Sequence, residues 1–174
     1  MKILRLYIKL IDGLNEYIGI FVSWLTTLMV LVVFYDTVMR YAFNRGNVAI
    51  QELEWHIFAV VFLIGAAYAL KHGAHVRVDI IYSRLKTKTK AWIDLLGSIV
   101  FLIPFAIMVI YSTENFIENS WAVREISPDP GGLHGRYILK AMIPAGFVLL
   151  ALQGTSEMFK NFLVALGIDE GGSE

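Results

Sequence analysis

Four long apolar stretches, separated by short polar segments, constrain the fold of this chain more than any other feature. They cover residues 17–39, 55–71, 92–113 and 137–160. A helix needs roughly 20 mostly apolar residues to cross the hydrocarbon core of a bilayer. Hydrophobic residues make up 57% of the chain, whereas about 45–50% is usual in soluble domains. We therefore predict an all-α integral membrane protein with four transmembrane helices. They form a single domain over residues 1–168, followed by a disordered acidic tail at 169–174.

The distribution of positive charge predicts the orientation of these helices. Of the 15 lysines and arginines, ten lie in the N-terminal segment, in the connection over residues 71–90 or after residue 157. Because cytoplasmic loops of membrane proteins are enriched in lysine and arginine, both termini and this connection are expected in the cytoplasm. Seven cations of the N-terminal segment and of the 71–90 connection are expected to set the topology. They are Lys2, Arg5, Lys9, Arg84, Lys86, Lys88 and Lys90. The connections over residues 40–54 and 114–136 then face outward.

The N-terminal segment is predicted to be a short amphipathic helix. Lys2, Arg5, Lys9 and Asp12 recur every three or four residues, with apolar residues between them. Such a helix lies in the membrane interface with its cations toward the lipid headgroups. The alternative is that this segment simply extends the first span.

Polar residues and prolines mark the ends and irregularities of the spans. Asp36 and Arg40 are spaced for an ion pair along one helix. Pro104 lies inside the third apolar stretch, where a kink is expected. Lys140 is expected to extend outward toward the interface. The alternating lysines and threonines over residues 86–90 indicate a solvated turn.

Composition and spacing argue against several classes of chemistry. The chain has no cysteine and a formal net charge of +0, so thiol chemistry is absent and no nucleic-acid partner is indicated. His56 and His72 lie at opposite ends of one span, about 24 Å apart, and cannot ligate one ion. Ser98 and Ser112 lie in an apolar helix without a nearby base. We expect no enzyme activity, no metal and no cofactor.

The middle of each span is also unlike that of a carrier. Carriers place ionisable groups near the bilayer midplane, whereas Asp36, Asp94, Lys140 and Glu157 all fall near helix ends. Gln153 is the most polar side chain well inside a span, and is expected to form a hydrogen bond between helices. This pattern indicates an accessory membrane subunit.

Two sets of motifs carry a family resemblance along nearly the whole chain. The first set comprises Glu52-x-Glu54-Trp55, Phe62-Leu63-Ile64-Gly65-Ala66-Ala67 and Gly73-x-His75-Val-x-Val-Asp79. The second comprises Ser127-x-Asp129-Pro-Gly-Gly-Leu133-x-x-Arg136-Tyr137, Lys140, Ile143-Pro-x-Gly146-Phe147 and Leu152-Gln153. In this order and spacing, they resemble the small four-span membrane subunit of tripartite ATP-independent periplasmic (TRAP) transporters.

The resemblance implies a division of labour in a bacterial or archaeal inner membrane. A periplasmic binding protein captures an organic anion, commonly a carboxylate, and a large multi-span subunit transports it with sodium. The small subunit binds the large one and stiffens its frame, without substrate or sodium sites of its own. On this basis the expected partner-contact residues are Glu52, Glu54, Gly65, Ala66, Ala69, His75, Arg77, Asp79, Arg124, Asp129, Gly131, Gly132 and Arg136.

Each of these assignments has a simpler alternative. Glu52 and Glu54 suit the start of a helix, where acids stabilise the helix dipole, and the 129–133 turn then only connects two helices. The 75–79 motif otherwise anchors its connection against the end of the second span or is a solvated loop. The small residues of the second span otherwise pack within this chain. Two other functional classes also remain open: a four-helix anchor of a haem or quinone redox complex, and a stand-alone small carrier.

Overall fold

The described part of the chain is entirely helical apart from its connections. The structure is a computed structural model that describes residues 2–74, 82 and 85–168. Its main elements are α1 (Lys2–Phe43), α2 (Val48–Lys71), α4 (Thr87–Gly97), the π-helical turn η1 (Ser98–Leu102), α5 (Ile103–Ala122) and α6 (Arg136–Ala165). α4, η1 and α5 form one helix, so four helices of the described residues are long and apolar enough to cross a membrane. The prediction of an all-α membrane protein with four spans is confirmed.

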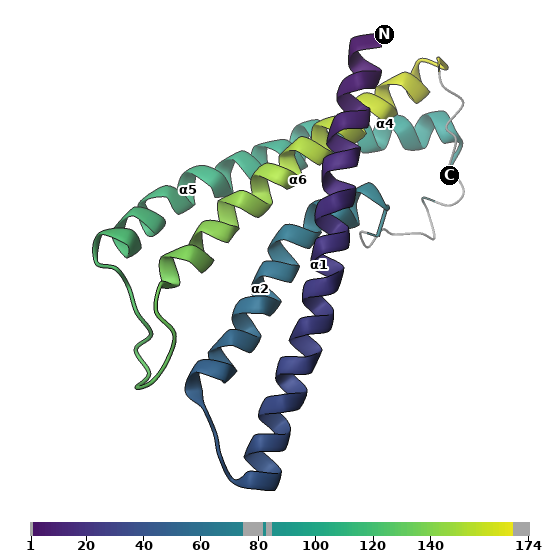
Figure 1. The fold of residues 1–174 in the computed structure, drawn as a ribbon. Helices are drawn as coiled ribbons and strands as arrows, with labels where there is room; N and C mark the ends of the chain where they lie inside the picture. Colours follow the sequence, from purple (N-terminus) through teal and green to yellow (C-terminus); the bar gives the residue numbers. More distant parts are fainter. Residues whose placement is uncertain (1, 75–81, 83–84, 169–174) are drawn as a thin grey trace.

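The helices are arranged as two hairpins that diverge from a common end (Figure 1). α1 and α2 form one hairpin, joined at residues 44–47, and α5 and α6 form the other, joined at residues 123–135. We call the end that carries these two loops the loop end. The start of α1, the end of α2, the start of α4 and the end of α6 gather at the opposite end, the terminal end. This grouping of segments agrees with the predicted topology, while the side of the membrane that each end faces stays a prediction.

The turns that bound the first hairpin have a clear local cause. α1 ends at Phe43, and the next residue, Asn44, has a φ of 53°, a left-handed conformation that asparagine tolerates better than most residues. Asn47 then caps α2, because its side-chain oxygen accepts a hydrogen bond from the Ala49 amide at 2.9 Å.

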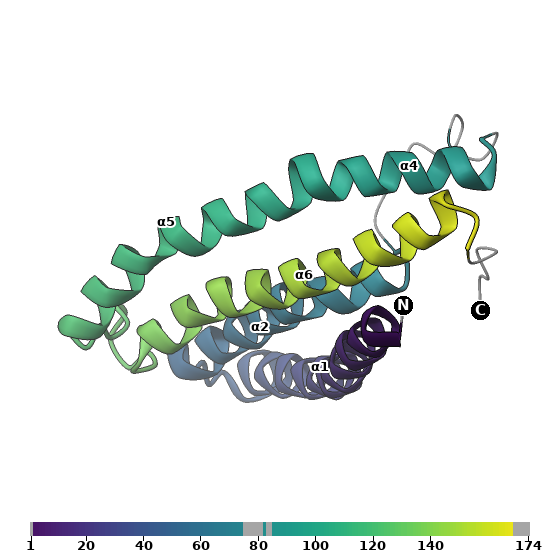
Figure 2. The same ribbon diagram turned by 90° about the horizontal axis from the view of Figure 1, so that it is seen from above.

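Pro104 is accommodated by a π-helical turn. The turn η1 ends directly before α5, and the Ile103 amide donates to the Ser98 carbonyl. Proline has no amide hydrogen and its ring crowds the preceding turn of a helix, so a locally wider turn lets the helix continue without a break. Figure 2 shows that the helix from α4 to α5 bends while it follows α6. The irregularity expected at Pro104 is present.

α6 is the central helix, because it contacts α1, α2, α4 and α5. Glycines permit its closest approaches. A Cβ on Gly146 would lie 2.5 Å from the carbonyl oxygen of Leu63 in α2, and one on Gly154 would lie 2.1 Å from a methyl carbon of Leu102 in η1. Small residues allow such packing of helix backbones within membranes.

The small residues predicted to give close packing are only partly those that the structure uses. A Cβ on Gly65 would meet Val22 at 3.4 Å, an ordinary contact. Ala66 and Ala69 are half-buried, whereas Ala67 beside them is completely buried. Gly19 lies directly against the Tyr68 ring. The sequence pattern therefore predicted the face of α2 that packs against other helices. It did not predict the glycines of α1 and α6 that lie opposite this face, Gly19 and Gly146.

Much of the apolar surface points away from the helix contacts. Trp24, Phe34, Phe62 and Phe101 are each more than 65% exposed, and at most 17% of the residues in any of the four most apolar windows are buried. A monomeric soluble protein rarely exposes so much contiguous apolar surface. This surface is suited to contact with lipid tails or with another membrane protein.

One local prediction needs correction and another stays a prediction. Residues 2–12 are helical as expected and continue without a break into the first span, because α1 runs from Lys2 to Phe43; their place in the membrane interface stays a prediction. No proline interrupts this segment, and a 42-residue helix is about 63 Å long, roughly twice the bilayer core. The solvated turn expected at residues 86–90 is instead the first turn of α4, which begins at Thr87. Lysine is a good helix former, so alternation with threonine does not prevent a helix.

The approach of α6 to α2 can be tested with a matched pair of glycine substitutions. We expect Gly146→Ala to lower the free energy of unfolding by about 1–3 kcal/mol, because the added carbon overlaps the Leu63 backbone. Gly13→Ala is the control, since a Cβ there meets nothing within 4 Å and alanine favours a helix by about 1 kcal/mol over glycine. Thermal unfolding in detergent measures both. Equal stability of the two variants would contradict the close approach.

Candidate functional site

Two clusters of polar side chains stand out, one at each end of the molecule. Between them the spans are uncharged: residues 17–35, 57–70, 95–113 and 141–156 contain no Asp, Glu, Lys or Arg. Among the described residues, no group of three or more His, Cys, Asp or Glu side chains is arranged to hold a metal ion. The chemistry of the described chain therefore lies in its two ends.

Glu52 organises the loop end. It lies one turn into α2 and is 4% exposed. One of its carboxylate oxygens accepts a hydrogen bond from the Ser127 hydroxyl, and the other accepts one from the Leu133 amide at 2.5 Å. A buried carboxylate needs such donors, because an unpaired buried charge is costly. Glu52 thus ties the start of α2 to the 127–133 turn, which is 75 residues further along the chain.

The glycine at position 132 makes this clamp possible. A Cβ on Gly132 would lie 2.4 Å from the Ser127 hydroxyl oxygen and 2.7 Å from a Glu52 oxygen. The turn is also closed by its own backbone, since the Ser127 amide donates to the Leu133 carbonyl at 3.0 Å. Gly132 therefore serves the internal geometry of the turn, whereas Gly131, with a φ of 83°, is exposed.

A second clamp joins the end of α5 to the start of α6. Glu125 accepts hydrogen bonds from Lys140 and from the Ser120 hydroxyl. These bonds, with that from Lys140 contributing most, hold the pKa of the Glu125 carboxyl below its ordinary value. Lys140 also lies 3.9 Å from the centroid of the Phe116 ring. The expectation that Lys140 extends outward is wrong, because a carboxylate within reach pairs with it and leaves it only 18% exposed.

The remaining residues predicted at the loop end divide by exposure. Arg124 and Asp129 are exposed, and Arg124 occupies a left-handed conformation with a φ of 46°. Arg136 is half-buried; its backbone amide donates to the Glu125 carbonyl, and its guanidinium lies 5.6 Å from the Trp55 ring centroid. Glu54 is half-buried, and its Oε1 forms no hydrogen bond within the described residues. Arg124, Asp129 and Gly131 thus remain accessible to a partner.

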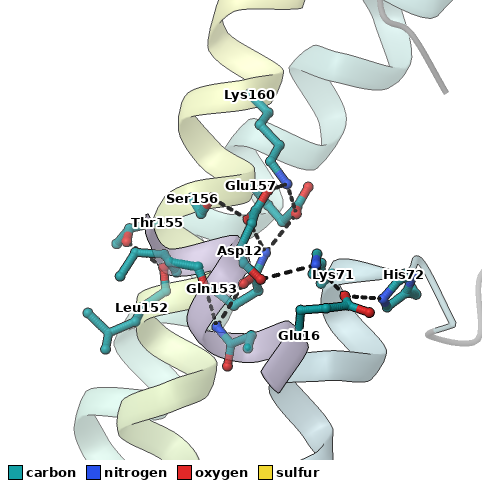
Figure 3. A network of polar contacts seen from close by, with 12 residues as sticks. Asp12, Glu16, Lys71, His72, Leu152, Gln153, Thr155, Ser156, Glu157 and Lys160 are labelled. Atoms are coloured by element: carbon teal, nitrogen blue, oxygen red, sulfur yellow. Dashed lines mark hydrogen bonds and ion pairs between the residues drawn. The ribbon is translucent and has the colours of Figure 1, made fainter. Parts of the chain in front are cut away.

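The terminal end holds a larger network, shown in Figure 3. Gln153 of α6 is completely buried. Its oxygen accepts from Asn15 at 2.8 Å, and its amide nitrogen donates to Asp12 and Glu157, both at 3.0 Å. The interhelical hydrogen bond predicted for Gln153 is confirmed. Two of these partners, Asp12 and Asn15, lie in the N-terminal part of α1, which is thereby held against α6.

Charged groups complete this network on both sides of Gln153. Lys160 lies 2.7 Å from Asp12 and 2.7 Å from Glu157. Lys71, at the end of α2, pairs with Glu16 and donates to the Asp12 carbonyl at 3.0 Å. The network therefore joins α1, α2 and α6. Sequence reasoning missed it, although the spacing of Asp12, Asn15 and Glu16 places all three on one face of a helix.

The basic residues predicted to set the topology also lie at the terminal end, as far as the structure describes them. Lys2, Arg5 and Lys9 are exposed on the first turns of α1, and Lys86 and Lys88 are exposed at the start of α4. Lys90 is half-buried, with its ammonium 5.1 Å from the Tyr82 ring centroid. Four predicted residues fall outside the described part of the chain: His75, Arg77, Asp79 and Arg84.

Comparison with known proteins identifies the family. The model of the DctQ component of tripartite ATP-independent periplasmic transporters matches residues 29–163. The chain belongs to the DctQ family. A TRAP transporter small permease protein from Haemophilus influenzae is 27% identical over 154 residues, which cover 88% of this chain and 93% of that protein. A C4-dicarboxylate TRAP transporter small permease protein, DctQ, from Vibrio cholerae is 22% identical over 162 residues, covering 82% of this chain and 68% of that relative.

DctQ-family membership confirms the resemblance seen in the sequence and makes the chain a small permease subunit of a TRAP transporter. It is thus a transporter component and a multi-pass inner-membrane protein. Two of the motifs that carry the resemblance, around Glu52 and around Ser127, are in direct contact. In this DctQ-family chain they are the two halves of the loop-end clamp.

The clamp can be tested by mobility at the turn. The chain has no cysteine, so Asp129→Cys gives a single site for a spin label on an exposed side chain. We expect Glu52→Ala to increase the mobility of this label, because the Ser127 hydroxyl and the Leu133 amide lose their acceptor, at about 1 kcal/mol for each hydrogen bond.

Gln51→Ala is the matched control for that experiment, since Gln51 is the exposed neighbour of Glu52 on the same helix. Electron paramagnetic resonance spectra of the labelled protein in detergent measure the mobility. Identical spectra for the Glu52→Ala and Gln51→Ala proteins would show that Glu52 does not hold the turn.

Proposed function

We propose that this chain is a non-catalytic scaffold within a sodium-coupled TRAP transporter. It binds the large multi-span subunit in the inner membrane of a bacterium or archaeon and stiffens that subunit's frame. The large subunit moves the substrate, an organic anion with a carboxylate group, after a periplasmic binding protein has captured it. The termini of the small subunit lie in the cytoplasm and its loop end faces the periplasm.

The segregation of charge carries this proposal. The uncharged middle of each span offers no ionisable side chain to bind an anion or to couple it to sodium, and carriers keep such groups near the midplane. The charged side chains near the helix ends are instead engaged largely with one another, as in the Glu125–Lys140 and Asp12–Lys160 pairs. Charges placed in this way stabilise an arrangement of helices, which is what a scaffold requires.

Surface character supports a large membrane partner. The apolar faces of α1 and of the α4–α5 helix expose large side chains over most of their length, including Trp24, Phe34 and Phe101. Helices in membranes associate through close packing and interhelical polar contacts. A small subunit with so little buried surface of its own gains a defined shape by packing against a larger one.

The loop end is the surface best placed to help dock the binding protein. Its two clamps hold the 123–135 connection against α2 and α6 through Glu52 and Glu125. Arg124 and Asp129 are exposed on this held connection, so they present charge of both signs without a large loss of entropy on binding. For the substrate, support comes from the Vibrio cholerae relative, whose name specifies C4-dicarboxylates.

Reconstituted transport tests the division of labour. Proteoliposomes that contain this chain alone should show no uptake of a C4-dicarboxylate. Vesicles that also contain the large subunit of the same transporter, with the loaded binding protein outside, should show uptake driven by an inward sodium gradient. Uptake by the small chain alone would refute the scaffold, and a Soret band in the purified, metal-replete protein would favour the haem-binding alternative.

Orientation is tested separately with reporter fusions. After Lys88, a reporter that works only in the cytoplasm should be active, and one that works only in the periplasm should be inactive. After Asp129, the opposite result is expected. The expected reason is the excess of lysine and arginine at the terminal end. Periplasmic activity at Lys88 would invert the topology and place the loop end in the cytoplasm.

A further inference from the structure

A polar pocket opens at the loop end of the first hairpin, apart from the two clamps. Its volume is about 420 Å³, within the range typical of small-molecule sites. It is lined by residues of α1, of the 44–47 loop and of the start of α2: Tyr35, Asp36, Met39, Asn44, Arg45, Gly46, Asn47 and Ile50. Such a pocket is large enough to receive one long side chain from a neighbouring protein.

Asp36 in the wall of this pocket is only half satisfied. Its side chain is 1% exposed, and its Oδ2 pairs with Arg40. Its other oxygen, Oδ1, is buried and forms no hydrogen bond within the described residues. An ionised carboxylate accepts hydrogen bonds on both oxygens, and burial of one without a donor is costly, most of all near the hydrocarbon of a membrane. The structure thus leaves an acceptor that needs a donor.

Glu54 adds a second unsatisfied acceptor nearby. It follows the pocket residue Ile50 by one turn of α2, and its Oε1 is also buried without a hydrogen bond in the described residues. It interacts electrostatically with Arg40, whose hydrogen bond goes to Asp36. Within the described residues, the ion pair of Arg40 is with Asp36, and no ion pair joins it to Glu54. The remaining cation at the pocket, Arg45, lies on the exposed loop.

We propose that this pocket receives a lysine or arginine side chain of the large membrane subunit, which donates to Asp36 and neutralises Glu54. A basic side chain supplies both the missing donor and the missing positive charge, whereas a neutral donor supplies only the first. The large subunit is the fitting source because Asp36 belongs to the membrane-spanning helix α1, which a protein in the same bilayer can approach from the side. The inference rests on the proposed function, since it requires that partner.

Thiol protection tests whether the pocket is filled on assembly. Ile50→Cys places the only thiol of the chain in the pocket wall, and Val123→Cys places one at the loop end on a side chain 72% exposed and outside the pocket. We expect a water-soluble maleimide to react with Ile50→Cys in the isolated subunit and at least about tenfold more slowly in the complex. The rate at Val123→Cys should change much less.

An equal rate at Ile50→Cys in the isolated subunit and in an intact complex would overturn the proposal. Protection that appears only after the binding protein is added would overturn the assignment to the large subunit. If Arg45→Ala alone raises the reactivity of Ile50→Cys in the isolated chain, the chain's own arginine fills the pocket, which also overturns it. Failure of the native subunit to form any complex would instead refute the proposed function, so the two failures are distinguishable.

Binding measurements test the role of Asp36 itself. Asp36→Asn keeps the shape of the side chain but removes its charge, and should weaken binding to the large subunit at least about tenfold. Arg40→Gln is the matched control, because it breaks the same internal pair but leaves the Asp36 carboxylate for the partner, so affinity should be retained. Equal weakening by both would assign Asp36 to an internal role and overturn the proposal. Circular dichroism and elution volume verify that each variant is folded.

Discussion

The contact of Gln153 with α1 is the interaction on which the arrangement of the helices most depends. A completely buried carboxamide must satisfy its donors and its acceptor within the protein, and here all of its partners lie on α6 itself or on the first turns of α1. Removal of any one partner leaves a buried polar group unpaired, which costs more than a single hydrogen bond contributes. The N-terminal part of the long first helix is thereby fixed against α6, while α2 meets α6 at Gly146 and is joined by Glu52 to the 127–133 turn that precedes α6.

Glycine and charge stabilise different parts of this structure. Near the middle of α6, Gly146 lets α2 approach until backbone meets backbone, and in lipid such packing replaces the hydrophobic effect as the source of helix association. At the two ends, where water competes for polar groups, ion pairs and buried hydrogen bonds join the helices. The middle of each span therefore packs without charge, and residues 17–35, 57–70, 95–113 and 141–156 contain no Asp, Glu, Lys or Arg. The packing and the proposed scaffold function both follow from this distribution of residues.

The sequence predicts the spans well and the contacts between them poorly, for a physical reason. Hydropathy, proline positions and positive charge are local properties, so the four helices and the irregularity at Pro104 could be predicted without knowledge of the fold. Contacts depend on which helix faces lie opposite each other. Glu52 therefore seemed equally suited to start a helix or to meet a partner, and only the structure brings Ser127 to it. Lys140 was misassigned for the same reason, because Glu125 lies 15 residues away in sequence. Gln153 was assigned correctly, since a carboxamide within an apolar span must find a partner somewhere.

The acids at the loop end differ in how many of their carboxylate oxygens accept hydrogen bonds within this chain. Fully bonded acids hold the fold, whereas acids with an unpaired oxygen are suited to bind a partner. Glu52 has donors on both oxygens, so a partner that took one of them would have to break the clamp first. Asp36 has a donor on one oxygen only, and Glu54 has a buried oxygen with none in the described residues. A partner that supplies donors to these two gains their interaction energy without the loss of any existing bond. Unsatisfied groups inside a membrane subunit are therefore better indicators of an interface than exposed charges, whose hydration must be given up on binding.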